Sequence, residues 1–419
     1  MPATQDTKIN STDIKILFAT RILRLFAYGF LSVVLVLHLV AAGLSERQIG
    51  LLLTLTLVGD TAISLWITTR ADRVGRRRML IAGAILMIFA SVIFGTAQSF
   101  ALLLIAATIG VISPSGNEVG PFLPIEQAAL SEQVDAGQRT RVFAWYNLVG
   151  SFATAVGAFA GGGFSQLLQG RGMTPLASYR AVVFGYAIIG LVMAALFSRV
   201  SPAVEAPLPR QIPEREGHPG TPLLGLGESR SIVLRLSGLF SIDAFAGGFV
   251  VQAFVAYWFH VKFGVAPAML GTIFFCANVL AGISALSAAR LAARIGLLRT
   301  MVVTHIPSNL LLILVPLMPS LPLAIGVLLL RFSISQMDVP TRQAYTMALV
   351  PPAERSAAAG VTAIARTVGA SLSPLAAGPL YGLASLASIP FFISGGLKIV
   401  YDVLIWLTFR KVKLPETSP

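Results

Sequence analysis

The stretch that decides the fold is Arg70-Ala71-Asp72-Arg73-Val74-Gly75-Arg76-Arg77-Arg78. It places five arginines, one aspartate and one glycine between two long apolar runs, residues 49–69 and 79–97. A segment with this much charge cannot lie in hydrocarbon, where even one charged side chain is costly. We therefore expect a short loop on one side of a membrane, and its positive charge indicates which side.

The composition of the whole chain indicates an integral membrane protein. Of its 419 residues, 55% are hydrophobic and only 12% are charged, and the mean hydropathy is +0.80. A soluble domain of this composition would expose more apolar surface than it could cover. The sequence offers roughly a dozen apolar runs, each near the ~20 residues that a helix needs to cross a bilayer. The predicted fold class is all-α and integral to the membrane.

The formal net charge of +13 has a simple explanation in such a protein. A basic soluble chain would suggest nucleic acid as a partner. Cytoplasmic loops of membrane proteins collect Lys and Arg in any case, so we expect no nucleic-acid partner. The single cysteine, Cys276, excludes a disulfide framework within the chain and a cysteine-based metal site. We expect no cofactor and no metal.

Polar segments divide the chain into five parts. We predict a polar tail over residues 1–15, a six-helix bundle over 16–198, a proline-rich linker over 199–230, a second six-helix bundle over 231–409 and a tail over 410–419. The prediction is therefore 12 transmembrane helices in two bundles of six.

The distribution of basic residues predicts the orientation of the chain. With the N-terminus inside, the outside loops carry only Arg47, Arg171, Arg180 and Lys262. The inside loops then hold the arginine stretch together with Arg139, Arg141, Arg199, Arg210, Arg215, Arg230, Arg294, Arg299, Arg342, Arg355 and the basic residues of the C-terminal tail. This imbalance places both termini and the linker in the cytoplasm. We expect a multi-pass protein of the plasma membrane, the inner membrane of a bacterium.

The two halves of the sequence form a repeat. Phe26-Ala27-Tyr28-Gly29-Phe30 matches Phe245-Ala246-Gly247-Gly248-Phe249, and Arg73-Val74-Gly75 matches Arg294-Ile295-Gly296. Pro121 matches Pro340 in the same order along the chain. Parallel repeats of this kind enclose a cavity between the halves near the middle of the bilayer.

With its position between the second and third predicted spans, the stretch Asp72-Arg73-Val74-Gly75-Arg76-Arg77 resembles the signature loop of the major facilitator superfamily. The resemblance extends over the whole chain in topology. The sequence departs from the family pattern at Thr68, in place of a glycine, and at Arg70, in place of a leucine. The resemblance implies transport of a small solute by rocking of one half against the other.

The resemblance also implies a role for the loop. A set of five residues is expected to form a latch that stabilises the outward-open state: Asp72, Arg73, Gly75, Arg76 and Glu126. Asp72 is expected to meet the start of the eleventh span near residues 356–359, and Arg76 or Arg73 to reach Glu126. In the simpler alternative, the arginines only hold the loop inside.

Ionisable residues within the spans are candidates for binding solute or coupling protons. They are Arg24, Asp60, Glu118, Asp243, Arg331, Asp338 and Arg366. Arg331 and Asp338 are one heptad apart and are expected to share a helix face. Arg366 is expected alternatively to pair with Glu118 or Asp338 as scaffolding.

Other polar residues of the spans have structural explanations. Lys398 and Asp402 have i,i+4 spacing, so their opposite charges are expected to pair on one helix. Arg21 lies near the entrance of the first span and is expected to reach the interface. The sequence places His38, His260 and His305 near span ends or turns, where an interfacial position is expected.

These observations predict a secondary active transporter that acts by rocker-switch alternating access, coupled to a proton gradient. A carboxyl group in apolar surroundings holds its proton more tightly, so Asp60, Glu118 or Asp243 could carry the coupling proton. The direction stays open, with export as one option. Arg24, Arg331 and Arg366 support an alternative, a uniporter or symporter of a small organic anion.

Other classes of protein are less compatible with the sequence. A membrane-embedded lipid-processing enzyme would need a catalytic motif, and neither His-Glu-x-x-His nor Gly-x-Ser-x-Gly is present. A channel or receptor would not explain the duplicated bundle. We expect a monomeric protein in the lipid bilayer that is not an enzyme, with a small solute and protons as its partners.

Overall fold

The computed structural model describes residues 11–134, 138–205, 226–227, 229–351 and 354–412. These residues form helices joined by short connections, with no strand among them. Large parts of the predicted tails and of the predicted linker lie outside the described residues. The predicted domain boundaries therefore stay predictions.

The first half of the chain, residues 11–205, contains eight α-helices and one 3₁₀ helix. They are α1 (Ser11–Ser32), α2 (Leu35–Ala41), α3 (Glu46–Val74), α4 (Arg76–Thr96), α5 (Phe100–Ile109), α6 (Phe122–Gln133), α7 (Arg139–Gly170), α8 (Pro175–Phe197) and η1 (Pro202–Val204). We call this part the N half.

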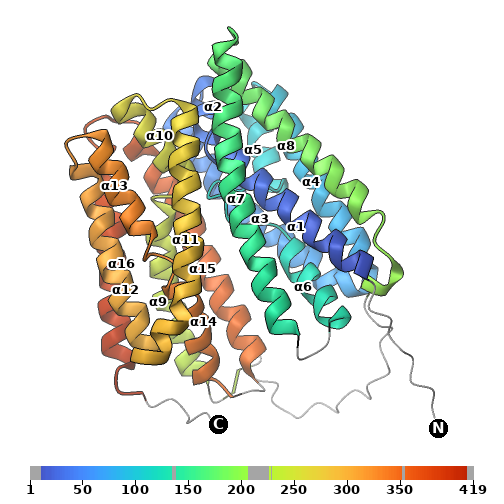
Figure 1. Cartoon of the computed structure of the whole chain (residues 1–419), viewed down its shortest axis with the longest axis vertical. Helices are drawn as coiled ribbons and strands as arrows, with labels where there is room; N and C mark the ends of the chain where they lie inside the picture. Colours follow the sequence, from blue (N-terminus) through green and yellow to red (C-terminus); the bar gives the residue numbers. More distant parts are fainter. Residues whose placement is uncertain (1–10, 135–137, 206–225, 228, 352–353, 413–419) are drawn as a thin grey trace.

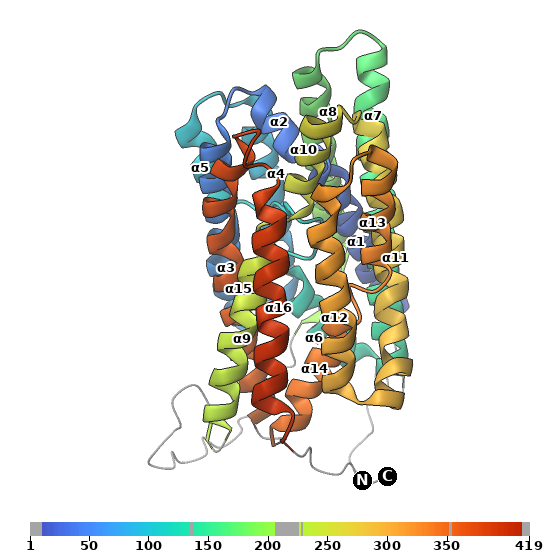
Figure 2. The ribbon, with the colours of Figure 1, turned by 90° about the vertical axis from the view of Figure 1, so that its left-hand side faces the viewer.

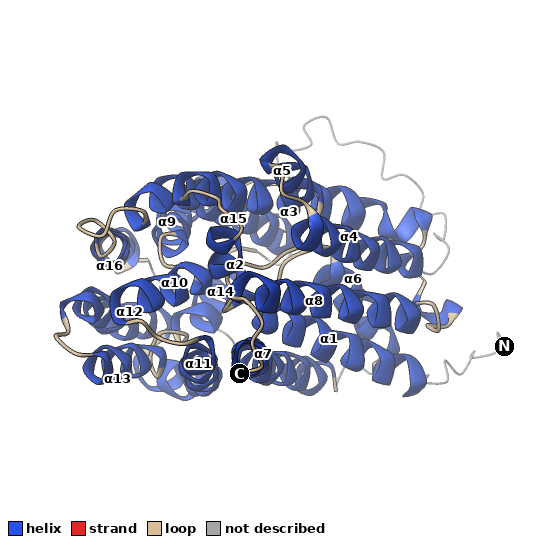
Figure 3. Cartoon of the chain, turned by 90° about the horizontal axis from the view of Figure 1, so that it is seen from above, coloured by secondary structure: helices blue, strands red, loops and turns tan. Residues whose placement is uncertain are grey.

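The second half, residues 226–412, repeats the same order of long and broken helices. Its elements are α9 (Arg230–Gly248), α10 (Gln252–Phe263), α11 (Pro267–Ile295), α12 (Leu297–Leu314), η3 (Val315–Leu317), α13 (Leu321–Phe332), α14 (Asp338–Leu349), α15 (Arg355–Tyr381) and α16 (Ile389–Phe409). We call this part the C half. Seen from above, the two halves form two groups of helices side by side (Figure 3).

Eight helical segments of the described chain are long and apolar enough to cross a membrane, and the bent pair α1 and α2 makes a ninth. The count of twelve is reached if α15 and two broken pairs, α5 with α6 and α13 with α14, each make one further span. The all-helical membrane fold is confirmed, and the number twelve stays a prediction.

Breaks occur in the first and fourth predicted spans of each half. They separate α1 from α2, α5 from α6, α9 from α10 and α13 from α14. The break between α5 and α6 is the longest and contains Ser113-Pro114-Ser115-Gly116. The backbone there reaches φ +71° at Gly116 and +83° at Gly120, a conformation that glycine adopts without strain. The fourth predicted span is thus two helices joined by an irregular segment, in line with the kink that the Pro-Gly run at residues 113–118 favours.

The carbonyl groups of this break are satisfied by neighbouring elements. The hydroxyl of Tyr186 donates to the carbonyl oxygen of Val111 at 2.8 Å, and that of Tyr28 donates to Val119 at 2.9 Å. The carbonyl of Pro114 accepts from the backbone N–H of Ala253 in the C half at 3.1 Å. Irregular backbone at membrane depth is tolerated only where protein groups supply such partners.

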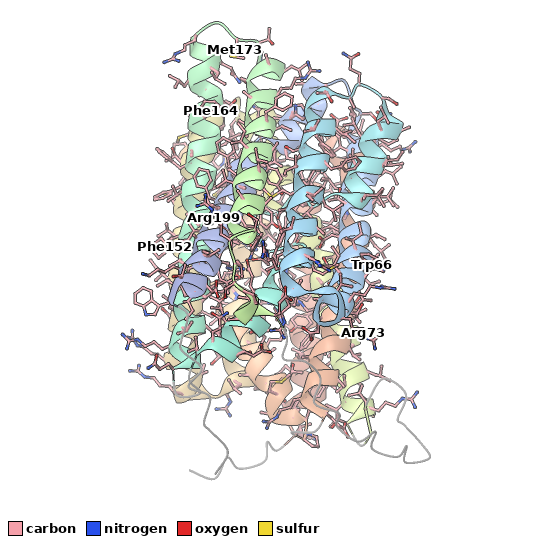
Figure 4. The ribbon with its side chains drawn as sticks, turned by 90° about the vertical axis from the view of Figure 1, so that its right-hand side faces the viewer. Trp66, Arg73, Phe152, Phe164, Met173 and Arg199 are labelled. Atoms are coloured by element: carbon pink, nitrogen blue, oxygen red, sulfur yellow. The ribbon has the colours of Figure 1, made fainter. Side chains whose placement is uncertain are left out.

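The two ends of the molecule differ in charge. One end carries the loop between α3 and α4, with Arg73, and the end of α16, with Arg410 (Figures 2 and 4). We call it the basic end. The opposite end carries the turn between α7 and α8, where Figure 4 labels Met173, and we call it the far end. Between them, the rings of Trp66 and Phe152 are exposed at 52% and 44%, as expected for side chains that face lipid.

The halves pack against each other through two helix pairs, α7 with α11 and α3 with α15. A Cβ atom added to Gly162 of α7 would lie 2.2 Å from the carbonyl oxygen of Pro267, and one added to Gly50 of α3 would lie 2.4 Å from that of Pro374. Each of these glycines lies in the part of its helix nearer the far end. Figure 1 shows α7 and α11 side by side at the far end and diverging toward the basic end.

Hydrogen bonds between the halves are few. In the described residues, the side-chain contacts are Gln252 Nε2 to Ser32 Oγ at 2.8 Å and Tyr257 OH to Glu46 Oε1 at 2.7 Å. Together with the Pro114–Ala253 contact, they join the breaks near the middle of the molecule and the N-terminus of α3. The conformation is therefore closed at the far end, by glycine packing and a small number of polar contacts.

Replacement of Gly162 by valine is expected to weaken this closure. Its Cβ would meet the backbone of α11, whereas a Cβ at the adjacent Gly163 has no atom within 4 Å. We expect Gly162→Val to raise the labelling rate of a Ser32→Cys variant by a membrane-impermeant maleimide applied from the far side by about tenfold. Gly163→Val is the matched control and should leave the rate unchanged. Equal rates in the two variants would contradict the role of this contact.

Candidate functional site

The N half contains a buried ion network around Arg24 of α1. The guanidinium binds the Glu126 carboxylate in a bidentate manner, with Nη1–Oε1 at 2.8 Å and Nη2–Oε2 at 2.6 Å. Its Nε donates to Glu118 Oε1 at 2.8 Å. Both Arg24 and Glu126 are completely buried. Bidentate, charge-assisted pairs are the arrangement best able to offset the loss of hydration.

Neighbouring side chains complete this network. Arg21, one turn before Arg24, pairs with the second oxygen of Glu118. Glu126 also accepts from the hydroxyl of Tyr146 and, at 3.2 Å, from that of Thr20. Two cations face two carboxylates, so the network has no net charge.

The C half contains a second network around Asp243 of α9. Its Oδ1 accepts from Lys398 Nζ at 2.6 Å, and its Oδ2 accepts from Arg342 Nη1 and Arg366 Nη1, both at 3.0 Å. Asp243 is 3% exposed. Arg342 Nη1 also binds Asp338 Oδ2 at 2.9 Å. One carboxylate thus joins three helices of this half, α14, α15 and α16, to α9.

A histidine extends this network toward a third carboxylate. His305 of α12 has Nε2 3.8 Å from Asp243 Oδ1 and Nδ1 2.8 Å from Asp402 Oδ1. The other oxygen of Asp402 accepts from Asn309 Nδ2 at 3.3 Å. Asp243, Asp338 and Asp402 together balance Arg342, Arg366 and Lys398 when His305 is neutral.

The two networks occupy equivalent places in the repeat. The offset of 219 positions that relates Phe26 to Phe245 also relates Arg24 to Asp243. In each half, this residue of the first helix binds the segment that follows the break of the fourth span, Glu126 of α6 or Arg342 of α14. The geometry is repeated while the sign of the central charge is inverted.

Two of the predicted candidates lie outside these networks. Asp60 of α3 is partly buried, receives a hydrogen bond from the backbone of Gly120 and has Ser64 Oγ 3.5 Å away, with no cation paired to it among the described residues. Arg331 lies at the end of α13, over the ring of Phe332 at 5.0 Å, and its buried Nε has no hydrogen-bond partner in the described part of the chain.

Several predicted pairings are wrong. Lys398 and Asp402 do not pair with each other, because Lys398 reaches Asp243 across the bundle and Asp402 binds His305. Arg366 pairs with neither Glu118 nor Asp338. Arg331 and Asp338 do not share a helix face, because residues 333–337 interrupt the helix between them.

Other expectations fail because residues lie deeper than predicted. Arg21 is 6% exposed and paired, so it does not reach the interface. His305 is likewise buried. Arg342, which the sequence places in a cytoplasmic loop, is 5% exposed within α14. Its spacing of four residues from Asp338 is the sequence signal that could have identified this pair.

The loop at residues 70–78 has a different set of partners from the predicted one. Arg76 binds Asp72 at 2.8 Å and Glu132 at 2.6 Å, so it does not reach Glu126. The carboxylate of Glu205 accepts from the backbone N–H groups of Arg76 and Arg77 at the N-terminus of α4, where an anion is favoured. All of these contacts lie within the N half.

Gly75 makes the sharp turn between α3 and α4. Its φ of +114° is a conformation that side chains rarely adopt, which explains why a glycine stands there. The equivalent Gly296, between α11 and α12, has φ +88°. The repeated Arg-Val/Ile-Gly turn is therefore structural in both halves.

The fold defines an all-helical, multi-pass membrane protein. A family model described as Major Facilitator Superfamily matches residues 17–374, and the chain belongs to this family. It carries a small solute across a membrane and is a transporter rather than an enzyme.

Known proteins resemble the chain in sequence or in fold. The chain is 32% identical to the uncharacterized membrane protein YJR124C of Saccharomyces cerevisiae, over 97% of this chain and 96% of that protein. A bacterial homologue of the lysosomal transporter Spinster, inward-facing and occupied, shares the fold at a TM-score of 0.73 and 16% identity, over 95% and 96% of the two chains. The nucleoside transporter NupG shares the fold at a TM-score of 0.71 and 13% identity, over 96% of this chain and 100% of that chain.

Loss of Glu126 is expected to destabilise the protein far more than loss of Glu132. Glu126→Ala leaves Arg24 buried with part of its charge unpaired, a cost of about 3–5 kcal/mol. Glu132→Ala removes a partly exposed partner of Arg76, a cost of about 0–1 kcal/mol. Thermal unfolding midpoints of the two purified variants measure the difference. Equal losses would contradict the assignment of Glu126 to the Arg24 network.

Proposed function

We propose that this protein is a secondary active transporter that works by rocker-switch alternating access. The observation that carries the proposal is the location of the ion pairs. Every salt bridge of the described residues joins two groups of the same half. The halves meet through apolar and glycine packing and through neutral or singly charged hydrogen bonds. The halves can therefore change their relative tilt without exposing an unpaired buried charge.

The far end is closed in this conformation, and the basic end would face the cytoplasm by the distribution of Lys and Arg. On this basis the conformation is inward-open, both termini lie in the cytoplasm, and the plasma membrane is the proposed location. The packing of Gly50 and Gly162 would open when the halves rock the other way.

The loop at residues 70–78 is proposed to act in that second conformation. In this one, Asp72, Arg76 and Glu132 form a network within the N half. Closure of the basic end would bring the start of α15 toward this loop, where Asp72, which is largely exposed, could bind its N-terminus. Arg73 and Gly75 would keep the turn in place, and Glu126 would act indirectly, through the packing of α6.

Asp60 is the proposed carrier of the coupling proton. Glu118 and Asp243 are each held by more than one cation, which opposes protonation, whereas Asp60 has only Ser64 and the backbone of Gly120 as partners. A carboxyl group that is partly buried without a cation can exchange a proton at moderate cost. Import and export are both compatible with this role.

Asp60→Asn is expected to uncouple transport from the proton gradient. A panel of labelled amino acids, sugars and organic acids would first identify a solute taken up by proteoliposomes with the wild-type protein. We expect the variant to accumulate this solute about tenfold less under an imposed pH gradient. Exchange of the same solute at equal pH on both sides is the internal control and should persist. Full gradient-driven accumulation by the variant would refute the role of Asp60.

A further inference from the structure

The C half contains a cavity next to the Asp243 network. It has a volume of about 540 Å³ and lies between α14 and α15, next to Phe240 of α9. This volume is in the range of small-molecule sites. Its polar lining residues are Arg342, Gln343 and Thr346 on α14 and Thr362, Arg366 and Thr367 on α15.

The charged groups that line this cavity are two arginines. Arg342 is almost fully buried, whereas the side chain of Arg366 is 33% exposed. Asp243, which binds both, is not among the lining residues and has both oxygens occupied, Oδ1 by Lys398 and Oδ2 by the two arginines. The wall of the cavity is therefore positive, although the network behind it is balanced.

Arg366 has donors to spare. A guanidinium carries five N–H groups, and among the described residues only its Nη1 is paired, with Asp243 at 3.0 Å. Arg342 also pairs through its Nη1, which serves both Asp243 and Asp338, but its side chain is almost fully buried and lies 5.5 Å from the ring of Phe240. Arg366 is thus the more accessible of the two donors for a ligand.

The neutral polar groups of the cavity differ in whether they can donate a hydrogen bond to an anion. Thr346, Thr362 and Thr367 each donate their hydroxyl proton to a carbonyl of their own helix, so their oxygens can only accept. Gln343 is exposed, and its amide can donate. Recognition of an anion would therefore depend on Arg366 and Gln343.

We propose that this cavity binds the anionic group, a carboxylate or a phosphate, of the transported solute, with Arg366 as the principal ligand and Gln343 as a second donor. The inference rests on the proposed transport function and specifies the solute class. A planar guanidinium fork matches the oxygens of either group. The unpaired N–H groups of Arg366 can bind an anion while its Nη1 keeps the contact with Asp243.

The test is a thermal stabilisation measurement on the purified full chain in nanodiscs of zwitterionic lipid. Inorganic phosphate and succinate are the probes, and sorbitol is the neutral control. A ligand that binds the folded state raises the unfolding temperature as its concentration increases. We expect at least one anion, and not sorbitol, to stabilise the wild type, and Arg366→Gln to weaken the affinity about tenfold.

Matched variants separate recognition from general damage. Arg299→Gln removes an exposed arginine at the start of α12 and should keep the wild-type response. Arg366→Lys keeps the charge without the fork, and Gln343→Ala removes the second donor. Both should show a weaker response, and they carry the test if Arg366→Gln does not fold. Wild-type affinity in all three cavity variants, or no response of the wild type to either anion, would overturn the proposal.

The same measurement in nanodiscs with phosphatidylglycerol distinguishes a lipid headgroup from a soluble anion. Stabilisation by this lipid through Arg366, with no response to soluble anions, would overturn the assignment to a solute. Because binding is measured without a gradient, the outcome does not depend on proton coupling. A failure of Asp60 as the proton carrier would leave this result unchanged.

Discussion

The constraint on which the rest of the structure depends is that a fully buried charge needs a partner, and in both ion networks the partners lie in the same half. Arg24 meets this requirement through Glu118 and Glu126, and Asp243 meets it through the basic groups of α14, α15 and α16. A buried ion pair adds little stability compared with apolar packing, but breaking one is costly. These networks therefore fix the arrangement of helices within a half, and among the described residues no salt bridge crosses between the halves. That division suits the proposed rocking of one half against the other.

The broken helices place polar backbone groups near the middle of the molecule. The breaks of the first, fourth and seventh predicted spans come together where Ser32 binds Gln252 and where Pro114 accepts from Ala253. The break in the fourth span also carries Glu118 and Gly120, so the same segment contacts the Arg24 network and Asp60. A change in the relative tilt of the halves would thus alter the surroundings of both the Arg24 network and Asp60. This connection is a spatial one, and coupling between the sites would need both to favour the same conformation.

Much of this arrangement could be predicted from the sequence, and the remainder shows what sequence alone lacks. Hydropathy and the repeat predict a membrane fold of two similar bundles, and the Pro-Gly composition of residues 113–118 predicts the kink in the fourth span. The candidates Arg24, Glu118, Asp243 and Arg366 were selected because charge in a span is costly, and each is in a buried network. Their partners were not predictable in this way, because the spacing along one helix does not reveal which helices are neighbours. Lys398 illustrates this: an acid four residues away is available, yet the closer partner is Asp243 on α9.

The central claim is that each half stays rigid while one end of the molecule opens and the other closes. Distances between spin labels, measured in a variant without the native cysteine, test this claim most directly. Labels at Met173 and Val261 report the far end, labels at Trp145 and Arg299 report the basic end, and labels at Trp145 and Val74 report the interior of the N half. We predict two populations for each of the first two pairs, with one distance lengthening as the other shortens when an anion is added or the pH is changed. The third distance should stay constant. A change in the third distance, or the same direction of change at both ends, would contradict the account.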